Sequence, residues 1–392
     1  MNTLTLRQNL IDNLVVALLF FFTAWAGQTL AFPPFVASVV CPASGVALAA
    51  TVLRGKHVWP GVLLGTMAIL IKVLIVEGGV PLGAGLACAL LVGAAQAVQA
   101  YLGGVLFQRW VGDPTFAAPG IAFRYAFVAA ISAIVGSAGA VAALVGFGFV
   151  QAELIPEITV WAVGRTAGML IFTPAILLCA RVKDYDVLKA RAGEAVLLFV
   201  AILAVTATVF GLSIDTQRHY PLEYVIFPGL LWALVRFGNR ELAVLVALVS
   251  VIATFATAHR LGPFAIGNNP NESLMLMELY FGVMTISALL GGAVAAQRNR
   301  AQHELEVAHH GLEARVEQRT IELRHANAAL QAEMAERHLL AKAFEFSSEP
   351  ALITDGERRI VSVNPAFSAL TGFSLADIRG QDLGRLAATG SE

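Results

Sequence analysis

The chain has 392 residues, of which 57% are hydrophobic and only 14% are charged, and its mean hydropathy is +0.73. So few charged residues cannot cover a water-facing surface, and the composition therefore excludes a soluble globular protein. The formal net charge is -1, and the basic residues are spread over loops and tail without forming one basic face. No nucleic-acid partner is expected.

Ten hydrophobic stretches follow one another along the chain, each close to the roughly 20 residues that cross a bilayer as a helix. The sequence therefore predicts an all-α polytopic membrane domain over residues 10–296, with the lipid bilayer as its first partner. The expected spans are 10–30, 34–53, 58–76, 82–107, 121–150, 158–180, 192–214, 222–237, 242–258 and 273–296.

The basic residues predict the orientation of these spans. Lys and Arg gather in one set of alternate loops, from Arg7 at the start to Arg298 and Arg300 at the end, whereas the opposite set holds only Arg218 and Arg260. Such residues stay on the cytoplasmic side of a membrane. Both termini are therefore expected in the cytoplasm, and the location that we expect is a bacterial inner membrane crossed many times.

The three cysteines, Cys41, Cys88 and Cys179, lie within or at the edge of apolar stretches. No pair of them has the spacing of a metal site or of a redox motif. We expect them to be packing residues, and we expect no metal.

Two basic side chains lie at membrane depth, where burying a charge costs about 2.5–3.5 kcal/mol. The predicted orientation places Lys72 and Arg165 in the outer half of the bilayer. One hypothesis is an outward-open polar pocket, in which these cations pair with acids or hold an anionic ligand. The alternative is that they only neutralise buried acids or snorkel to the interface, and snorkelling is the favoured interpretation for Lys72. The acids expected on the same side are Glu77, Glu153, Glu157, Asp215, Glu223 and Glu278.

Several motifs in the predicted membrane domain point to one family. They read CPASG from Cys41, RGKHVWPGVLLG from Arg54, WAVGRTAGMLIFTP from Trp161 and LEYVIFPGLLWALVRFGNR from Leu222, followed by HRLGPF from His259. Together they resemble the membrane-associated sensor domain of type one, the MASE family of bacterial signalling proteins. The motif residues are Pro42, Ser44, Gly45, Trp59, Pro60, Gly61, Trp161, Gly164, Gly168, Pro174, Pro228, Trp232, Arg236 and Pro263.

Two positions depart from the resemblance. Cys41 stands where relatives usually have Trp, and Arg165 stands where they often have an acid, so a ligand of the relatives is not carried over to this chain. The glycine pairs Gly61 with Gly65 and Gly164 with Gly168 are each four residues apart. Ordinary close packing of helices is the favoured interpretation of both pairs.

The composition changes after Arg300, and residues 297–342 are predicted to form a cytoplasmic signalling helix. Several positions of its heptad seam are polar, so a continuous tight zipper is not expected. We prefer a homodimer through this helix with weak core layers, and the alternative is a single solvated helix. The two seam positions hold Leu305, Leu312, Arg319, Ala326, Glu333 and Leu340, and His309, Val316, Leu323, Leu330, Arg337 and Phe344.

Residues 343–392 begin with two short apolar runs, 351–354 and 360–363, joined by Asp355-Gly356, which predicts a β-hairpin. A short helix is predicted to start at the Asn-Pro-Ala-Phe motif and a second to be capped by Ser374. The segment resembles the first half of a PAS domain, an incomplete α/β unit that we expect to be marginally folded, and no cofactor is assignable to it. The residues that carry the resemblance are Asn364, Pro365, Phe367 and Gly372.

The resemblance implies a signal-input module that responds to an unknown small molecule or membrane state. Related chains commonly continue into diguanylate cyclase or phosphodiesterase domains, which implies control of cyclic-di-GMP by an output domain outside this chain. The sequence contains no motif of those enzymes, so no catalytic activity is expected of the chain itself. The alternatives are the sensor part of a histidine kinase and a transporter with a regulatory tail.

Overall fold

A computed structural model describes residues 3–29, 41–150, 154–182, 186–211, 222–265, 270–382 and 384. The chain divides into two compact units, Met1–Ala301 and Gln302–Glu392. Each unit is described by itself.

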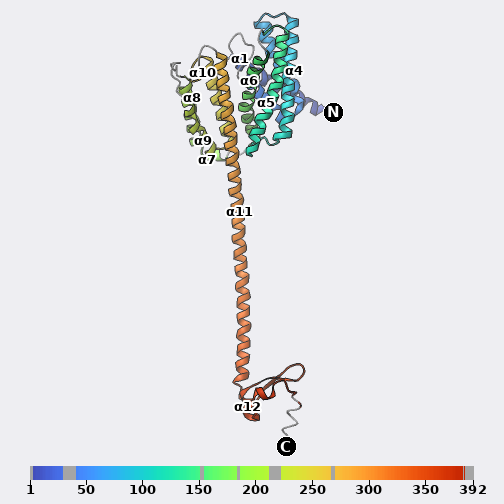
Figure 1. Ribbon diagram of the computed structural model, residues 1–392, viewed down its shortest axis with the longest axis vertical. Helices are drawn as coiled ribbons and strands as arrows, with labels where there is room; N and C mark the ends of the chain where they lie inside the picture. The colour runs from blue at the N-terminus through green and yellow to red at the C-terminus, as the bar shows by residue number, and fades with distance from the viewer. Residues whose placement is uncertain are drawn as a thin grey trace. The chain divides into compact units, whose positions relative to one another are not determined.

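Helices make up the described part of the first unit (Figure 1). Its first half holds α1 (Thr3–Thr29), α2 (Pro42–Arg54), η1 (Lys56–Val58), α3 (Trp59–Leu70), η2 (Ile71–Glu77), α4 (Leu82–Leu106), η3 (Phe107–Val111), α5 (Pro119–Gly146) and α6 (Leu154–Arg181). Its second half holds α7 (Asp186–Ala190), α8 (Ala192–Gly211), η4 (Leu222–Ile226), α9 (Phe227–Arg236), α10 (Asn239–Ala258) and the start of α11 (Pro270–Glu345).

Eight helices among the described residues are long and apolar enough to cross a membrane. The predicted spans 34–53 and 222–237 fall instead on the shorter helices α2, of 13 residues, and α9, of 10 residues. The start of the former span lies outside the described residues. Ten spans and the cytoplasmic placement of both termini therefore stay predictions. Many large apolar side chains point outward from the helices, which suits contact with lipid tails, and examples are Leu14, Phe22, Phe127, Leu197 and Leu231.

Proline starts several of these helices. Pro42 and Pro228, which the sequence predicts to start or kink helices, lie in the first turns of α2 and α9. A proline in the first turn removes only an N–H that has no partner within the helix. Pro174, in contrast, lies inside α6.

The helix α6 occupies the middle of the unit, because it packs against α2 and α5 on one side and against α10 on another. Close approach to α2 depends on glycine. A Cβ atom on Gly168 of α6 would lie 2.1 Å from the carbonyl oxygen of Cys41, and one on Gly45 of α2 would lie 2.5 Å from the carbonyl oxygen of Gly168. Thr173 adds a hydrogen bond of 3.0 Å from its hydroxyl to the carbonyl oxygen of Gly45.

The glycine pair on α3 packs against the N-terminal helix. A Cβ atom on Gly61 would lie 2.5 Å from the carbonyl oxygen of Asn13, and one on Gly65 would lie 2.7 Å from that of Ala17. The packing interpretation of this pair is therefore confirmed, since both glycines let α3 approach α1 backbone to backbone.

The helix α11 is a single helix of 76 residues that crosses the boundary between the two units (Figure 1). The predicted last span and the predicted signalling helix are thus one uninterrupted element. Side chains from Gln302 to Ala343 are exposed in the single chain.

After α11, the second unit contains a hairpin of β1 (Leu352–Thr354) and β2 (Ile360–Val363), followed by α12 (Pro365–Thr371) and α13 (Leu375–Ile378). The strands pair antiparallel, with Leu352 opposite Val363, and the predicted hairpin is confirmed. The predicted helix start at the Asn-Pro-Ala-Phe motif and the predicted cap at Ser374 are confirmed as well. The side chain of Asn364 accepts a hydrogen bond of 2.8 Å from the backbone N–H of Phe367, and Ser374 forms a capping box with Asp377.

Candidate functional site

A cavity opens among α1, α2, α3, η2, α4 and α6 in the membrane unit. Its cavity volume is about 90 Å³. Its wall is mostly apolar, with a few polar side chains that converge on it, which is the usual character of a small-molecule site. The lining residues are Phe20, Ala24, Gln28, Cys41, Pro42, Thr66, Ile69, Leu70, Val73, Val92, Gln96, Trp161 and Arg165.

Arg165 is the charged residue of this wall, and its side chain is only 4% exposed. The α-helical spacing of four residues places Trp161 over the guanidinium, whose Cζ lies 5.2 Å from the centre of the Trp161 ring. On the other side, Nη1 of Arg165 donates a hydrogen bond of 3.1 Å to Oε1 of Gln99 on α4.

Gln99 itself is held in place by two further helices. Its Nε2 lies 3.9 Å from the sulfur of Met169, which also receives the hydroxyl of Ser132 at 3.7 Å. A Cβ atom on Gly136 of α5 would lie 2.1 Å from Oε1 of Gln99. Glycine at this position therefore makes room for the amide that orients Arg165.

The positive charge of Arg165 has no carboxylate partner within 4 Å among the described residues. A guanidinium has five N–H donors, and Gln99 accepts from one nitrogen. The buried carbonyl oxygen of Gln28, which also lines the cavity, has no hydrogen-bond partner in the described part of the chain. The cavity thus presents a cation without an acidic partner among the described residues, and this charge favours an anion, whereas the carbonyl oxygen of Gln28 accepts only from a ligand that carries a hydrogen-bond donor.

Lys72 does not line this cavity. Its ammonium group pairs with Glu77 at the other end of η2, where the Lys72 and Glu77 side chains are 31% and 54% exposed. The geometry therefore does not support the hypothesis that Lys72 and Arg165 act in one pocket, because Lys72 is outside the cavity and pairs with Glu77, five residues later in the chain.

The predicted acids do not gather around Arg165 either. Glu157 is buried in the first turn of α6, Glu223 is half-buried in η4, and Glu278 is buried on α11. None of these three lines the cavity of Arg165. Glu153 and Asp215 lie outside the described residues. The position of an acid near the end of a span predicts its depth in the membrane. It does not predict how the helix is rotated about its own axis, and that rotation determines whether the acid faces Arg165.

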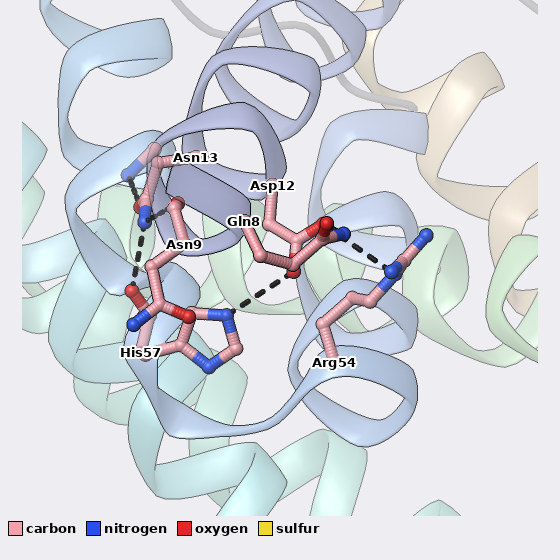
Figure 2. Close-up of polar contacts among 7 residues, drawn as sticks. Gln8, Asn9, Asp12, Asn13, Arg54 and His57 are labelled. Carbon is pink, nitrogen blue, oxygen red and sulfur yellow. Dashed lines mark hydrogen bonds and ion pairs between the residues drawn. The ribbon is translucent and has the colours of Figure 1, made fainter. Parts of the chain in front are cut away.

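A second polar cluster joins α1 to the turn between α2 and α3 (Figure 2). The side chain of Asp12 is 7% exposed and accepts from Nη1 of Arg54 and from Nε2 of His57, each at 3.3 Å. Asn13 donates to the carbonyl oxygen of His57 at 3.0 Å, and its Oδ1 accepts from the backbone N–H of Gly61 at 2.7 Å. The cluster anchors the N-terminal helix to the RGKHVWPG motif.

Asp12 and Asn13 are not among the residues for which the sequence predicts a functional role. The sequence does offer a signal for them: Asp12 and Asn13 are adjacent polar residues in an apolar stretch, and a later motif carries the basic residues Arg54 and His57. This pairing links residues 45 apart, which no local pattern predicts.

The motif residues of the last part of the unit have structural contacts. Trp232 and Arg236 of α9 both donate to Oε1 of Glu194 on α8, at 3.4 Å and 2.7 Å. Asn239 begins α10 against α11, where a Cβ atom on Gly292 would lie 1.8 Å from its Oδ1. These motifs therefore dock α9 and α10 onto their neighbours.

Two family models match the chain. The MASE1 model matches residues 12–299, and the model of a PAS domain matches residues 338–391. No curated protein and no solved structure matches the chain. The MASE1 match covers the helical membrane unit from Asp12 onward to residue 299, including the residues that line the cavity of Arg165. The chain therefore belongs to the MASE1 family of membrane sensor domains, here followed by a PAS domain.

Proposed function

We propose that this chain is a sensory input module that binds a small anion in the cavity of Arg165 and passes the signal along α11. The observation that carries this proposal is the buried guanidinium of Arg165, which lines a cavity and has no acidic partner among the described residues. A charged side chain kept at membrane depth without an opposite charge beside it is by default a functional one.

The packing of α6 supports a route from the cavity to α11. Leu170, five residues after Arg165 on α6, lies near Gly282 of α11, since its Cδ1 is 3.7 Å from where a Cβ atom on Gly282 would be. Ala167 and Ile171 belong to the same buried cluster as Met277 and Phe281. A movement of α6 on anion binding would therefore displace side chains of α11, the helix that leads to the PAS domain.

The anion proposal is tested by thermal unfolding of the full chain in neutral detergent, with inorganic phosphate, nitrate, succinate and citrate as probes. A bound ligand stabilises the folded state by mass action, so at least one anion should raise the unfolding temperature. Arg165→Gln should abolish that rise, and Lys72→Gln should retain it because Lys72 is outside the cavity. An equal rise in Arg165→Gln would contradict the proposal, and so would the absence of any rise.

The signalling helix is proposed to form a homodimer. Apolar side chains on its seam are exposed in the single chain, among them Leu305 at 72%, Leu312 at 59% and Leu323 at 69%. The full chain with its three cysteines replaced by Ala provides the test. Under mild oxidation, Leu312→Cys should give a disulfide-linked dimer, whereas Ala314→Cys, on the opposite face of the helix, should not. Equal cross-linking of the two variants would mean that the seam does not face a partner.

For the output, we propose control of cyclic-di-GMP synthesis or hydrolysis by a domain outside this chain, with the module in a bacterial inner membrane and both termini in the cytoplasm. Family membership supports this output, and a histidine kinase is the second candidate. The intact mass of the protein extracted from its own membranes, followed by sequencing of any additional residues, distinguishes them. Accumulation of labelled citrate or phosphate in vesicles, lost in Arg165→Gln, would instead indicate a transporter.

A further inference from the structure

A second cavity lies in a groove between α5, α6 and α11, and other residues of α6 than Trp161 and Arg165 line it. Its cavity volume is about 520 Å³, which is within the roughly 300–1000 Å³ of small-molecule sites. Exposed Ile134, Leu279 and Val283 line it, so in a membrane it opens toward the lipid.

One ionisable residue, Glu278 of α11, lines this groove. The residue is only 2% exposed, and neither oxygen of its carboxyl group has a hydrogen-bond partner among the described residues. No Lys, Arg or His lines the groove. A buried carboxylate without a partner is costly, and a membrane protein retains such a group mainly where it serves a function.

The other polar groups of the groove are two hydroxyls, and both of their protons are already committed. Thr159 donates to the carbonyl oxygen of Ile155 at 2.9 Å, and Thr166 donates to that of Ala162 at 2.7 Å. Their oxygens keep only acceptor lone pairs, and an ionised carboxylate is an acceptor only. With Glu278 ionised, as it is when a cation pairs with it, the groove offers acceptors and negative charge to a ligand that must bring hydrogen-bond donors.

We infer that this groove binds a lipophilic amine in its protonated form, with the ammonium group donating to the Glu278 carboxylate and the apolar body lying along α5 and α6. The positive charge compensates the buried carboxylate, and the acceptors of the groove match the ammonium N–H groups. Glu278 lies eight residues into α11, about 12 Å from its start, so the ligand contacts the output helix directly. The site is independent of the Arg165 cavity, with which it shares no lining residue.

The test uses the full chain in dodecyl maltoside, a neutral detergent, and a photoreactive alkylamine that carries a diazirine in its chain. Labelling of peptides from α6 and α11 is quantified by mass spectrometry. Glu278→Gln keeps the shape of the side chain and removes its charge, and labelling should fall about tenfold or more, as expected from loss of a charged hydrogen bond. Glu223→Gln, which changes an acid outside the groove, should leave labelling unchanged.

Competition on the wild-type chain gives a second measurement that does not depend on any variant. Dodecylamine should displace the probe, and dodecanol, which has the same chain and a neutral head, should not. Undiminished labelling of Glu278→Gln would overturn the inference. Equal competition by dodecanol would also overturn it, since it would mean that the groove takes a neutral lipid chain without regard to the charge of the head group.

Discussion

The guanidinium of Arg165 on α6 and the side-chain carbonyl of Gln99 on α4 are joined by a hydrogen bond of 3.1 Å between residues 66 positions apart in the chain. Both side chains are buried, at 4% and 3% exposure. The bond therefore links two helices through a charged group that has no acidic partner among the described residues.

Gln99→Leu should lower the free energy of unfolding by about 1.5–3 kcal/mol, because it removes the acceptor from a buried cation. Arg165→Leu combined with Gln99→Leu should cost less than the sum of the two single changes, since no charge is then left unsolvated. The measurement is a double-mutant cycle in detergent unfolding. Strictly additive single and double changes would show that the two groups do not interact. Gln318→Leu, at an exposed position of α11, is the control.

Gly168→Ala should destabilise the membrane unit by about 1–3 kcal/mol, the usual cost of overpacking. The added Cβ would lie 2.1 Å from the backbone oxygen of Cys41, which cannot move without shifting the start of α2. Gly146→Ala is the matched control, because a Cβ there meets no atom within 4 Å. Equal unfolding temperatures for the two variants would contradict the close approach of α2 and α6.

Asp12→Asn should loosen α1 from the turn between α2 and α3, at a cost of about 1 kcal/mol. The change removes the charge that both Arg54 and His57 contact, and the modest size reflects the exposure of the Arg54 side chain, 57%. Limited proteolysis near the N-terminus should become faster. Glu313→Gln, which affects an exposed pair on α11, should leave the rate unchanged, and a similar change in both variants would argue against an anchoring role.

Asp113, in the loop between η3 and α5, gives a prediction on acid stability. Burial alone raises the pKa of its carboxyl group, but hydrogen bonds from Thr115 and Ala117 and the charge of Arg300 on α11 lower the pKa below its ordinary value. Because the folded pKa is below the unfolded one, the carboxylate stabilises the fold at neutral pH. This contribution is fully present above the unfolded pKa and is lost as the pH falls through the lower folded pKa.

Thr115→Val removes the hydroxyl donor to Asp113 and should raise the pKa of that carboxyl group. The unfolding temperature should then be lower at neutral pH, and the difference from the wild type should shrink as the pH falls from about 7 to about 3. Asp113→Asn is the control, because its side chain does not ionise. In that background, the effect of Thr115→Val on the unfolding temperature should not depend on pH through residue 113. A difference that stays constant over the whole range would contradict the prediction.

Local sequence rules predicted the secondary structure of the C-terminal unit well. The hairpin between Leu352 and Val363 follows from two β-branched runs around Asp-Gly, and the caps at Asn364 and Ser374 follow from side chains that bond the next turn. Asn364 is also buried and accepts from the backbone N–H of Ala351 at 2.9 Å. That second contact reaches across the hairpin, and the motif alone did not predict it.

The candidate site was predicted only in part. Arg165 was singled out because a basic residue at membrane depth is costly, and the structure places it on a cavity. Its expected companions lie elsewhere: Lys72 pairs with Glu77, one of the acids expected on its side, and Glu278 lines a different groove. Sequence position along a span reports depth, whereas the companions depend on which way each helix faces.

Composition, periodicity and capping act within one element, so the amino-acid sequence is enough to predict a membrane protein of apolar helices followed by a long helix and a PAS-like hairpin. The pairing of polar side chains follows from the packing of the helices, as in the contacts of Arg165 with Gln99 and of Asp12 with His57. Those contacts depend on the rotation and spacing of helices far apart in the chain. Glycines such as Gly168 and Gly136 determine that spacing by the atoms that they lack.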